Sequence, residues 1–511
     1  GDSNVAVGVD VGTTLTTGDD NMLIGRGAGN AITGTSDTVL IGRDAGGAIN
    51  STDANGTIAI GYNAGLNITS GRYNVAIGYK ALDAEDDGDG NTAVGYQALT
   101  AQTGTSGTVG NTAVGYNAGQ NITTGVQNNA FGYTALANTT TGGANIGIGY
   151  EAGKFNQTGG SNVFIGDQAG RGVFENSPGG NVGIGYRALM GITNGSGNVV
   201  LGQYAADSLT SAQNNVIIGP SAGATMTTTS YTVLIGANAG NDINSTDAAG
   251  TVAIGYYAGA TLTDGQYNTL VGYQAGDGLT TGNDNTIIGY IAGGSTDFNA
   301  GTANTFVGSN AGNYATNTNS NVYVGYRAAG TNKQGGYNVV IGDQAGYQPR
   351  GNEFSGSHNV FMGYAAGYNT GADKNVFIGS GAGQYTTGSQ NTFVGQSAGL
   401  GGQTSAPFSS GENNVAMGYQ ALRGFTTGYQ NNIIGYRAGY STTTGFTNQY
   451  IGYYAGYRNT TGRANTAIGA NSQQGVSGQT TGQYNVSLGE NSLFGLTTGN
   501  HNFVVGSNAG Y

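Results

Sequence analysis

The sequence predicts an all-β fold, a parallel β-solenoid (β-roll) of about 29 coils of roughly 17 residues each. Three observations lead to this prediction. A glycine that follows an aliphatic residue recurs along the whole chain, β-branched residues alternate with small ones beside it, and no helical periodicity persists. Residues 1–511 are therefore expected to form a single continuous repeat array without helices, with irregular coil lengths after residue 342.

The recurring glycine is the anchor of the repeat. The first anchor is Gly8, the last is Gly506, and most neighbouring anchors lie 17 residues apart. Intervals of 19 or 20 fall after every third or fourth coil as far as Gly342, which indicates loops inserted into a coil of fixed length. The chain has 100 glycines but only 4 prolines and no G-X-Y period, so collagen is excluded.

Two further positions are defined relative to the anchor. The residue before it is always Ile, Val, Leu, Met or Phe, which predicts one buried position per coil. The predicted core residues are Ile24, Ile41, Ile60, Ile77, Val94, Val114, Ile165, Ile254, Ile341 and Ile468. The residue three after the anchor is Ala in 26 of the 29 coils, which predicts a tight corner or a close chain contact. The predicted corner residues are Ala64, Ala98, Ala118, Ala169, Ala258 and Ala345.

The rest of the coil carries a second apolar site and a turn. Seven residues after the anchor, many coils have an apolar residue such as Ile68, Ile122 or Leu279, which predicts a second short strand. Thr-Thr-Gly elements such as 123–125 follow, and their glycine suits a sharp turn. Each coil is thus expected to run strand, corner, strand, turn.

The few apolar residues in each coil predict self-association. They bury little area against the entropic cost of ordering a whole coil, so a lone solenoid would be only marginally stable. We therefore expect a homotrimer of parallel chains, intertwined or side by side. The repeat also continues to both ends of the sequence, from Asn4 to Tyr511, which predicts an array excised from something longer or one that continues end to end.

The repeat also resembles a known family. Asn111–Ala118 (NTAVGYNA) and Asn465–Ser472 (NTAIGANS) look like the head repeats of YadA-like trimeric autotransporter adhesins. Asn91–Leu99 (NTAVGYQAL) also resembles repeats of phage tail fibres and large bacterial surface proteins. The resemblance covers nearly the full chain and implies a trimeric, left-handed parallel β-roll that projects from a surface. The coil is longer than in the adhesin heads, and no coiled-coil stalk is visible, so a phage or a cellular parent stays open.

Composition narrows the partners and the location. Charged residues make up 8% of the chain and the net charge is −12, so the basic footprint of a nucleic-acid-binding protein is absent. No apolar run is long enough to span a membrane, and Gly1–Asn4 does not begin a signal peptide, so any export signal or anchor is expected outside this sequence. The expected partners are further copies of the chain, then host-cell surface glycans or proteins, and the expected location is extracellular, at a cell surface or on a virion.

An acidic cluster is the one candidate metal site, and no other cofactor is expected. Its spacing faintly resembles a calcium loop with a glycine at the sixth position, but the twelfth position is Val94 where a bidentate Glu belongs. A solvated acidic turn is the alternative. The candidate calcium ligands are Asp83, Glu85, Asp87 and Asp89.

Other surface features allow a binding function but no catalysis. Tyr follows the anchor in 15 coils, so stacking would form a ladder that either binds sugars or covers apolar surface. Regularly spaced Thr could template ice, although its offset drifts at each insertion. His358 and His501 each stand alone, as ordinary loop residues. We expect a non-enzymatic structural or adhesive fibre module with candidate contact loops at 83–89, 171–180, 347–358 and 400–413; the alternative is a subunit of an extracellular filament or surface layer.

Overall fold

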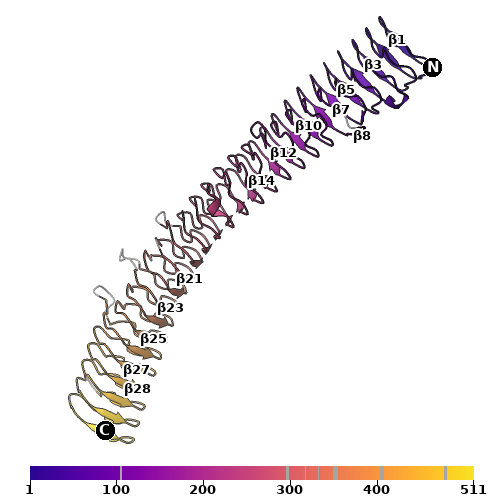
Figure 1. Cartoon of the computed structure of the whole chain (residues 1–511). Helices are drawn as coiled ribbons and strands as arrows, with labels where there is room; N and C mark the ends of the chain where they lie inside the picture. The colour runs from indigo at the N-terminus through magenta and orange to yellow at the C-terminus, as the bar shows by residue number, and fades with distance from the viewer. Residues whose placement is uncertain are drawn as a thin grey trace. The chain divides into compact units, whose positions relative to one another are not determined.

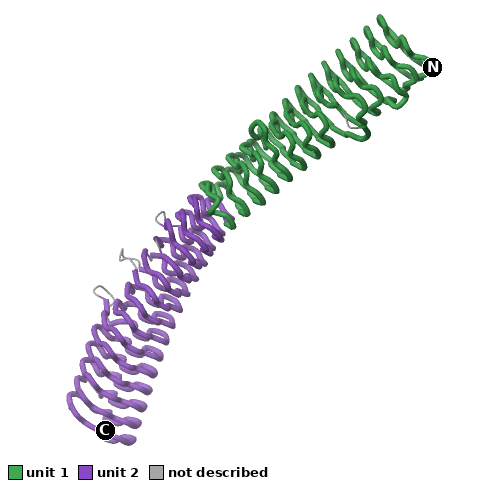
Figure 2. The backbone as a smooth tube through the Cα atoms, in the orientation of Figure 1, with its two compact units in different colours: residues 1–251 green, residues 252–511 purple. Residues whose placement is uncertain are grey.

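Each coil contributes one three-residue strand, and successive strands pair in parallel within two units, residues 1–251 and residues 252–511 (Figures 1 and 2). The predicted all-β parallel solenoid is confirmed in both units, because residues in equivalent positions pair coil after coil, as Ala76 pairs with Ala93 and Ala93 with Ala113. The computed structural model describes residues 1–103, 106–294, 298–316, 318–331, 333–348, 355–402, 408–476 and 480–511.

The strands of the first unit share one pattern, a buried central residue between two outward ones. They are β1 (Val5–Val7), β2 (Met22–Ile24), β3 (Val39–Ile41), β4 (Ile58–Ile60), β5 (Val75–Ile77), β7 (Thr92–Val94), β9 (Thr112–Val114), β10 (Asn129–Phe131), β11 (Ile146–Ile148), β12 (Val163–Ile165), β13 (Val182–Ile184), β14 (Val199–Leu201), β15 (Val216–Ile218) and β16 (Val233–Ile235). Only β1 departs from it, since its three residues are all exposed.

The strands of the second unit repeat this pattern. They are β17 (Val252–Ile254), β18 (Thr269–Val271), β19 (Thr286–Ile288), β20 (Thr305–Val307), β21 (Val322–Val324), β22 (Val339–Ile341), β23 (Val360–Met362), β24 (Val376–Ile378), β25 (Thr392–Val394), β26 (Val415–Met417), β27 (Asn432–Ile434), β28 (Gln449–Ile451), β29 (Thr466–Ile468), β30 (Val486–Leu488) and β31 (Phe503–Val505). Only its last strand, β31, departs from the pattern, since its central residue is half-buried and its two outward residues are exposed.

The prediction of the core residues is wrong by one position, because the buried residue of each strand directly precedes the predicted one. Ile24, Ile41, Ile60, Ile77, Val94, Val114, Ile165, Ile254 and Ile341 are only half-buried, and Ile468 is 40% exposed. Side chains alternate along a strand, and the inward one is the central residue, such as Leu23, Ala76 or Phe377. The aliphatic residue before the anchor therefore lies on the outer side of the sheet.

The predicted corner alanines are all fully buried. Ala64, Ala98, Ala118, Ala169, Ala258 and Ala345 have no exposed surface. The corner N–H donates to the carbonyl oxygen of the anchor glycine, over 3.4 Å from Ala64 to Gly61, which closes a tight turn. Ser472 and Ser492 occupy the same corner position and are also fully buried, so the position is packed closely around a small side chain in these coils.

The anchor glycines stack into a column that only glycine can form. Their φ angles lie between +123° and +142°, a region that other residues rarely adopt. A Cβ atom on Gly95 would lie 2.2 Å from the carbonyl oxygen of Gly115 in the next coil. The close backbone contact between coils therefore requires glycine at this position.

Buried asparagines form a second column, one residue before most strands; threonine takes this position before β3, β4, β16 and β17. Asn128 Oδ1 accepts hydrogen bonds from the backbone N–H and the side-chain amide of Asn145, over 3.1 and 3.0 Å. Asn128 Nδ2 donates to the carbonyl oxygen of Gly142 over 2.9 Å. Because this pattern recurs through most coils, the asparagine ladder satisfies polar groups that the solenoid interior would otherwise leave unpaired.

The core is filled from two positions that compensate for one another. One is the strand centre, and the other is the turn position directly after the corner alanine. Where the turn position is Leu the strand centre is Ala, Gly or Ser, as in the pair Ala76 and Leu82. Where the centre is aromatic the turn position is Gly or Ala, and a Cβ on Gly383 would lie 2.4 Å from the Phe377 ring. The two side chains share one volume.

The predicted second strand does not form, although its apolar residues are buried. Ile68, Ile122 and Leu279 are at most 1% exposed but lie in turns. Among the described residues, β6 (Gly88–Asp89) and β8 (Gly107–Thr108) make the only other sheet. Two single 3-10 turns, η1 (Thr52–Ala54) and η2 (Thr246–Ala248), occupy insertions that the prediction of no helix did not include.

Candidate functional surface

In each unit the outward residues of the strands form a surface without charge, which we call the outer sheet face: the first and third residue of every strand from β1 to β31 except β6 and β8. The third residue is always aliphatic, Phe or Met, and the first is mostly Val, Ile or Thr. Phe131 and Ile148 are each 39% exposed. A solvated protein surface normally interleaves charged side chains, so this face has the composition of an interface.

Tyrosines border this face in the first unit. Tyr62, Tyr79, Tyr96, Tyr116, Tyr133 and Tyr150 stack in that order with ring centroids 5.0–5.3 Å apart and interplanar angles of at most 16°. We call them the first tyrosine ladder. At one end Arg43 lies over the Tyr62 ring, 4.3 Å from its centroid, and donates to the Tyr62 hydroxyl over 2.6 Å. The predicted stacking of these tyrosines is therefore confirmed.

The threonines after the second apolar site bond the coils together. Thr123 Oγ1 donates to the carbonyl oxygen of Thr140 over 3.2 Å, and Thr193 does the same to Thr210 over 3.1 Å. The same bond recurs at further coils of both units. Because these hydroxyl protons point at backbone carbonyls, they are not free to order water into an ice-like lattice.

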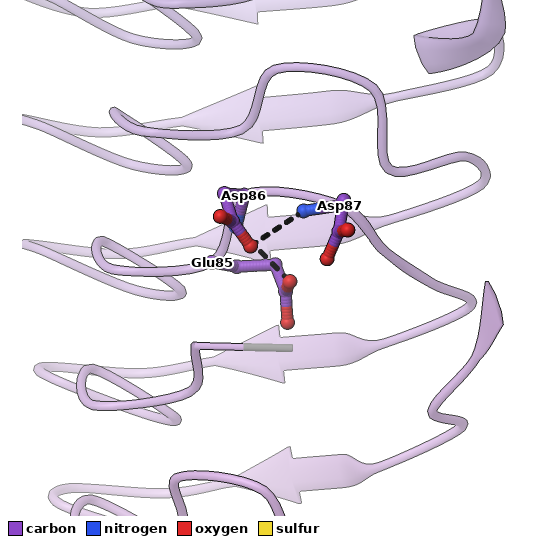
Figure 3. A group of neighbouring side chains, drawn as sticks. All are labelled: Glu85, Asp86 and Asp87. Carbon is purple, nitrogen blue, oxygen red and sulfur yellow. Dashed lines mark hydrogen bonds between the residues drawn. The ribbon is translucent and has the colours of Figure 1, made fainter. Parts of the chain in front are cut away.

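The acidic turn does not bring its four predicted ligands together. Carboxylate oxygens of Glu85, Asp86 and Asp87, the residues drawn in Figure 3, lie within 4.8 Å of one another. Asp83 instead faces Lys80, and Asp89 faces Arg72, each over 3.7 Å. The predicted set of Asp83, Glu85, Asp87 and Asp89 is therefore wrong as a cluster, since residues two apart in this turn do not all point the same way.

Glu85 has a structural role in this turn. It occupies the second apolar site of its coil and is fully buried. Its Oε1 accepts hydrogen bonds from the N–H groups of Asp86 and Gly88, over 3.0 and 2.8 Å, and its Oε2 accepts one from Asn91 over 3.4 Å. Burial raises the pKa of Glu85, and the two backbone hydrogen bonds offset part of this rise. Protein donors thus already satisfy the carboxylate that a calcium ion would need.

Neighbouring carboxylates are shifted in the same direction. Burial raises the pKa of Asp83, with the Lys80 ammonium acting against it. The pKa of Asp87 is also raised, by loss of solvent and by the adjacent Asp86 carboxylate. Loss of solvent, with repulsion from the adjacent carboxylate added at Asp87, explains these shifts without a bound ion.

The two histidines lie in equivalent turns beside tyrosines. His358 stacks on Tyr337 with centroids 5.1 Å apart, and His501 stacks on Tyr484 at 5.0 Å. Both have a φ near +60°. Each thus continues a column of surface rings, with no second histidine beside it in the described structure.

Of the predicted contact loops, 171–180 is fully described. Val173 and Phe174 are 52% and 65% exposed there, and Phe174 meets Phe155 edge to face at 6.3 Å. Arg171 ties the loop to Glu151 over 2.7 Å. Within the loops 347–358 and 400–413, residues 349–354 and 403–407 lie outside the described residues.

No family model matches this chain, and no curated protein matches it. Within the described residues, no helix is long or apolar enough to cross a membrane.

The outer sheet face is the functional feature that the sequence patterns did not reveal. The sequence predicts burial for the third residue of each strand, because a large aliphatic side chain beside a glycine suggests burial. The informative signal is the small residue at many strand centres, for example Ala76 between Val75 and Ile77. A three-residue strand with a small centre must turn its two large side chains outward.

Proposed function

We propose that this chain is a non-catalytic structural and adhesive fibre module, located outside the cell or on a virion, that assembles as a homotrimer of parallel chains. The rigid coils space and present binding surfaces. The outer sheet face carries the proposal, and the resemblance of the repeat to adhesin heads and tail fibres agrees with it. A subunit of an extracellular filament or surface layer is the alternative.

The chemistry of parallel sheets supports self-association. Such sheets occur almost always with both faces covered, and their strands are then apolar on both sides. In this chain the inner face is covered by the coil itself, whereas the outward strand residues are mostly apolar and half-buried or exposed. A second copy presents the same uncharged face at the same coil spacing, so it fits this surface without burying an unpaired charge.

The exposed area is large enough for a stable assembly. Each of the five tyrosines from Tyr79 to Tyr150 is 42–47% exposed, which leaves roughly 90 Å² per ring or about 450 Å² in all. The aliphatic residues of the neighbouring strands add to this. A standard interface buries about 800 Å² on each partner, so the first unit alone approaches the required area.

Light scattering on the purified chain tests the proposal. We expect the mass of three chains, and the charged variants Ile77→Lys and Ile148→Lys should reduce it towards one chain, because lysine on the outer sheet face opposes burial. Thr141→Lys is the matched control, since Thr141 is exposed in a turn away from the strands, and it should leave the mass unchanged.

The other outcomes contradict the trimer in different ways. A stable single chain at all concentrations would overturn self-association. A broad series of masses that grows with concentration would favour the filament. A trimer that Ile77→Lys and Ile148→Lys leave intact would show that another surface holds the chains together.

A further inference from the structure

One segment of the second unit is positively charged, whereas the chain as a whole is negatively charged. The protein has 15 Lys and Arg against 27 Asp and Glu, but residues 413–489 contain four arginines and no acidic residue. Every ion pair found in the described structure lies in the first unit, such as Arg171 with Glu151 and Arg187 with Asp207. The arginines of this segment therefore have no carboxylate partner among the described residues.

Two of these arginines, Arg423 and Arg437, lie among tyrosines at one edge of the coils. Arg437 Cζ is 5.5 Å from the Tyr436 ring centroid and 5.7 Å from that of Tyr440. Arg423 Cζ lies 5.6 Å from the Tyr440 centroid, and its Nη1 donates to the Tyr440 hydroxyl over 3.3 Å. Arg423 Nε is buried without an acceptor. The guanidinium groups are thus positioned by aromatic rings and keep unused donor capacity.

Beside them lies an open groove of about 460 Å³. Tyr440, Tyr457 and Arg458 line it, together with Ser441, Thr443 and Thr460. Tyr440 and Tyr457 stack with centroids 5.1 Å apart, and Tyr454 meets Tyr457 edge to face at 4.8 Å. The groove therefore has aromatic walls, neighbouring hydroxyl groups and a cationic rim.

We propose that this groove binds an acidic polysaccharide, which rests on the proposed adhesive function and names its ligand. Arginine forks bind carboxylate or sulfate groups through paired N–H donors, and the tyrosine hydroxyls match sugar hydroxyls. Tyrosine rings at equivalent positions repeat about every 5.1–5.2 Å along the coils, close to the advance of one sugar unit along an extended β-linked hexose chain. Successive sugars can thus meet successive coils in register.

The arrangement of the rings favours a polysaccharide over a single-stranded nucleic acid. Bases bind by stacking on free aromatic faces. The faces of Tyr419, Tyr436 and Tyr453 are taken up by one another, with centroids 5.2 Å apart. The ladder therefore presents ring edges and hydroxyl groups, which suit hydrogen bonds to sugars.

Titration of the full chain with four polymers tests the proposal. The probes are cellulose sulfate for sulfate, polymannuronate for carboxylate, hydroxyethyl cellulose as neutral polysaccharide and oligo(dT) as polyanion without sugar acids; the three polysaccharides are all β-linked. We expect one or both acidic polysaccharides to bind, and Arg437→Gln or Arg458→Gln to weaken that binding about tenfold or more. Arg437→Lys, which keeps the charge but loses the fork, should recover part of the loss.

Arg26→Gln is the matched control, because it removes the same charge from an exposed site in the first unit and should change binding less than about twofold. Absence of binding to both cellulose sulfate and polymannuronate overturns the proposal. Equal binding of hydroxyethyl cellulose would show that the arginines play no part, and equal binding of oligo(dT) with the same loss in the variants would show that the ligand is not a polysaccharide. Light scattering of the same samples keeps the two proposals separate, since a single-chain mass contradicts the trimer and leaves the titration interpretable.

Discussion

The first tyrosine ladder, from Tyr62 to Tyr150, and the second, from Tyr419 to Tyr453, use the same position of the coil. Their ring centroids are 5.0–5.3 Å apart in the first and 5.2 Å apart in the second. The residue after each tyrosine differs. It is Asn, Lys, Gln, Asn, Thr and Glu along the first ladder, and Gln420, Arg437 and Tyr454 along the second. The backbone therefore fixes the spacing of the rings, and the residue that follows each tyrosine determines which polar or charged groups lie beside them.

The cores of two regions differ in a parallel way. Around β5, β7 and β10 the interior is filled from the turn, by Leu82, Leu99 and Leu136 behind small strand centres. Around β23 to β25 it is filled from the strand, by Phe361, Phe377 and Phe393, whose centroids stack 5.2 and 5.0 Å apart. The same coil thus tolerates two opposite distributions of side-chain volume, provided that their sum is kept.

The largest expected effect is in the core that is filled from the turn. Leu82→Ala should lower the free energy of unfolding by about 2–5 kcal/mol, because it leaves a cavity that the neighbouring coils cannot close. Urea unfolding together with hydrogen exchange measures this loss. Moving the volume to the strand, with Ala76→Leu and Leu82→Gly together, should recover most of it. A double variant as unstable as the sum of its single variants would show that the two positions do not share one volume.

The core that is filled from the strand should fail through overpacking. Gly383→Ala places a Cβ 2.4 Å from the Phe377 ring, which should cost about 1–3 kcal/mol. Gly90→Ala is the control, since Gly90 also has a positive φ, +72°, but no atom within 4 Å of the added Cβ. The loss in the free energy of unfolding is measured with urea for both variants. The excess loss in Gly383→Ala over Gly90→Ala gives the cost of overpacking, apart from backbone strain. Equal losses would mean that strain alone accounts for the effect.

The asparagine ladder should behave alike in both regions. Asn128 and Asn431 make matching hydrogen bonds, and each Nδ2 reaches a glycine carbonyl over 2.9 Å. Asn128→Ala and Asn431→Ala should each lower the free energy of unfolding by roughly 1–3 kcal/mol, because buried backbone groups lose their partners. Local hydrogen exchange at the adjacent coils measures both. A clear difference between the two sites would show that the regions differ in more than core filling and surface chemistry.

The smallest effect is expected at Glu85, the charged residue in the core of the first region. Its pKa is raised above 4.5 in the folded chain, so folding takes up a proton and stability rises as the pH falls from the raised value through 4.5. Above that window the buried charge is a penalty. Glu85→Gln should therefore raise the melting temperature slightly at about pH 7 and not at about pH 4. An equal or lower melting temperature at the higher pH would contradict this.

Much of this fold could be predicted from the sequence because its columns repeat. The anchor at Gly95 and the corner at Ala98 each recur at a fixed offset, so the parallel solenoid followed from spacing alone. The direction in which each side chain points could not be predicted from this spacing. Ile77 and Ala76 are neighbours, and only the geometry of a short strand decides which one turns inward.

The candidate surfaces were less predictable because they depend on pairing between coils. Arg437 and Tyr454 are 17 residues apart, and their hydrogen bond of 3.3 Å arises only when the coils stack. The role of Glu85 likewise required Asn91 and Gly88 to be placed around it. The spacing of acidic residues in the sequence shows neither which carboxylates are buried nor which protein donors bind them. Both must be known to tell whether a carboxylate needs a bound ion.

The column of anchor glycines has a consequence for how such a chain can evolve. Gly78 packs against Gly95 in the same way as Gly95 packs against Gly115. The backbone contact at the anchor glycine is therefore the same between any two successive coils. Unequal recombination between repeats in the gene could then add or remove whole coils in one step. Each event would preserve the glycine contacts between successive coils. It would also change the number of coils that separate a segment such as residues 413–489 from other segments of the chain.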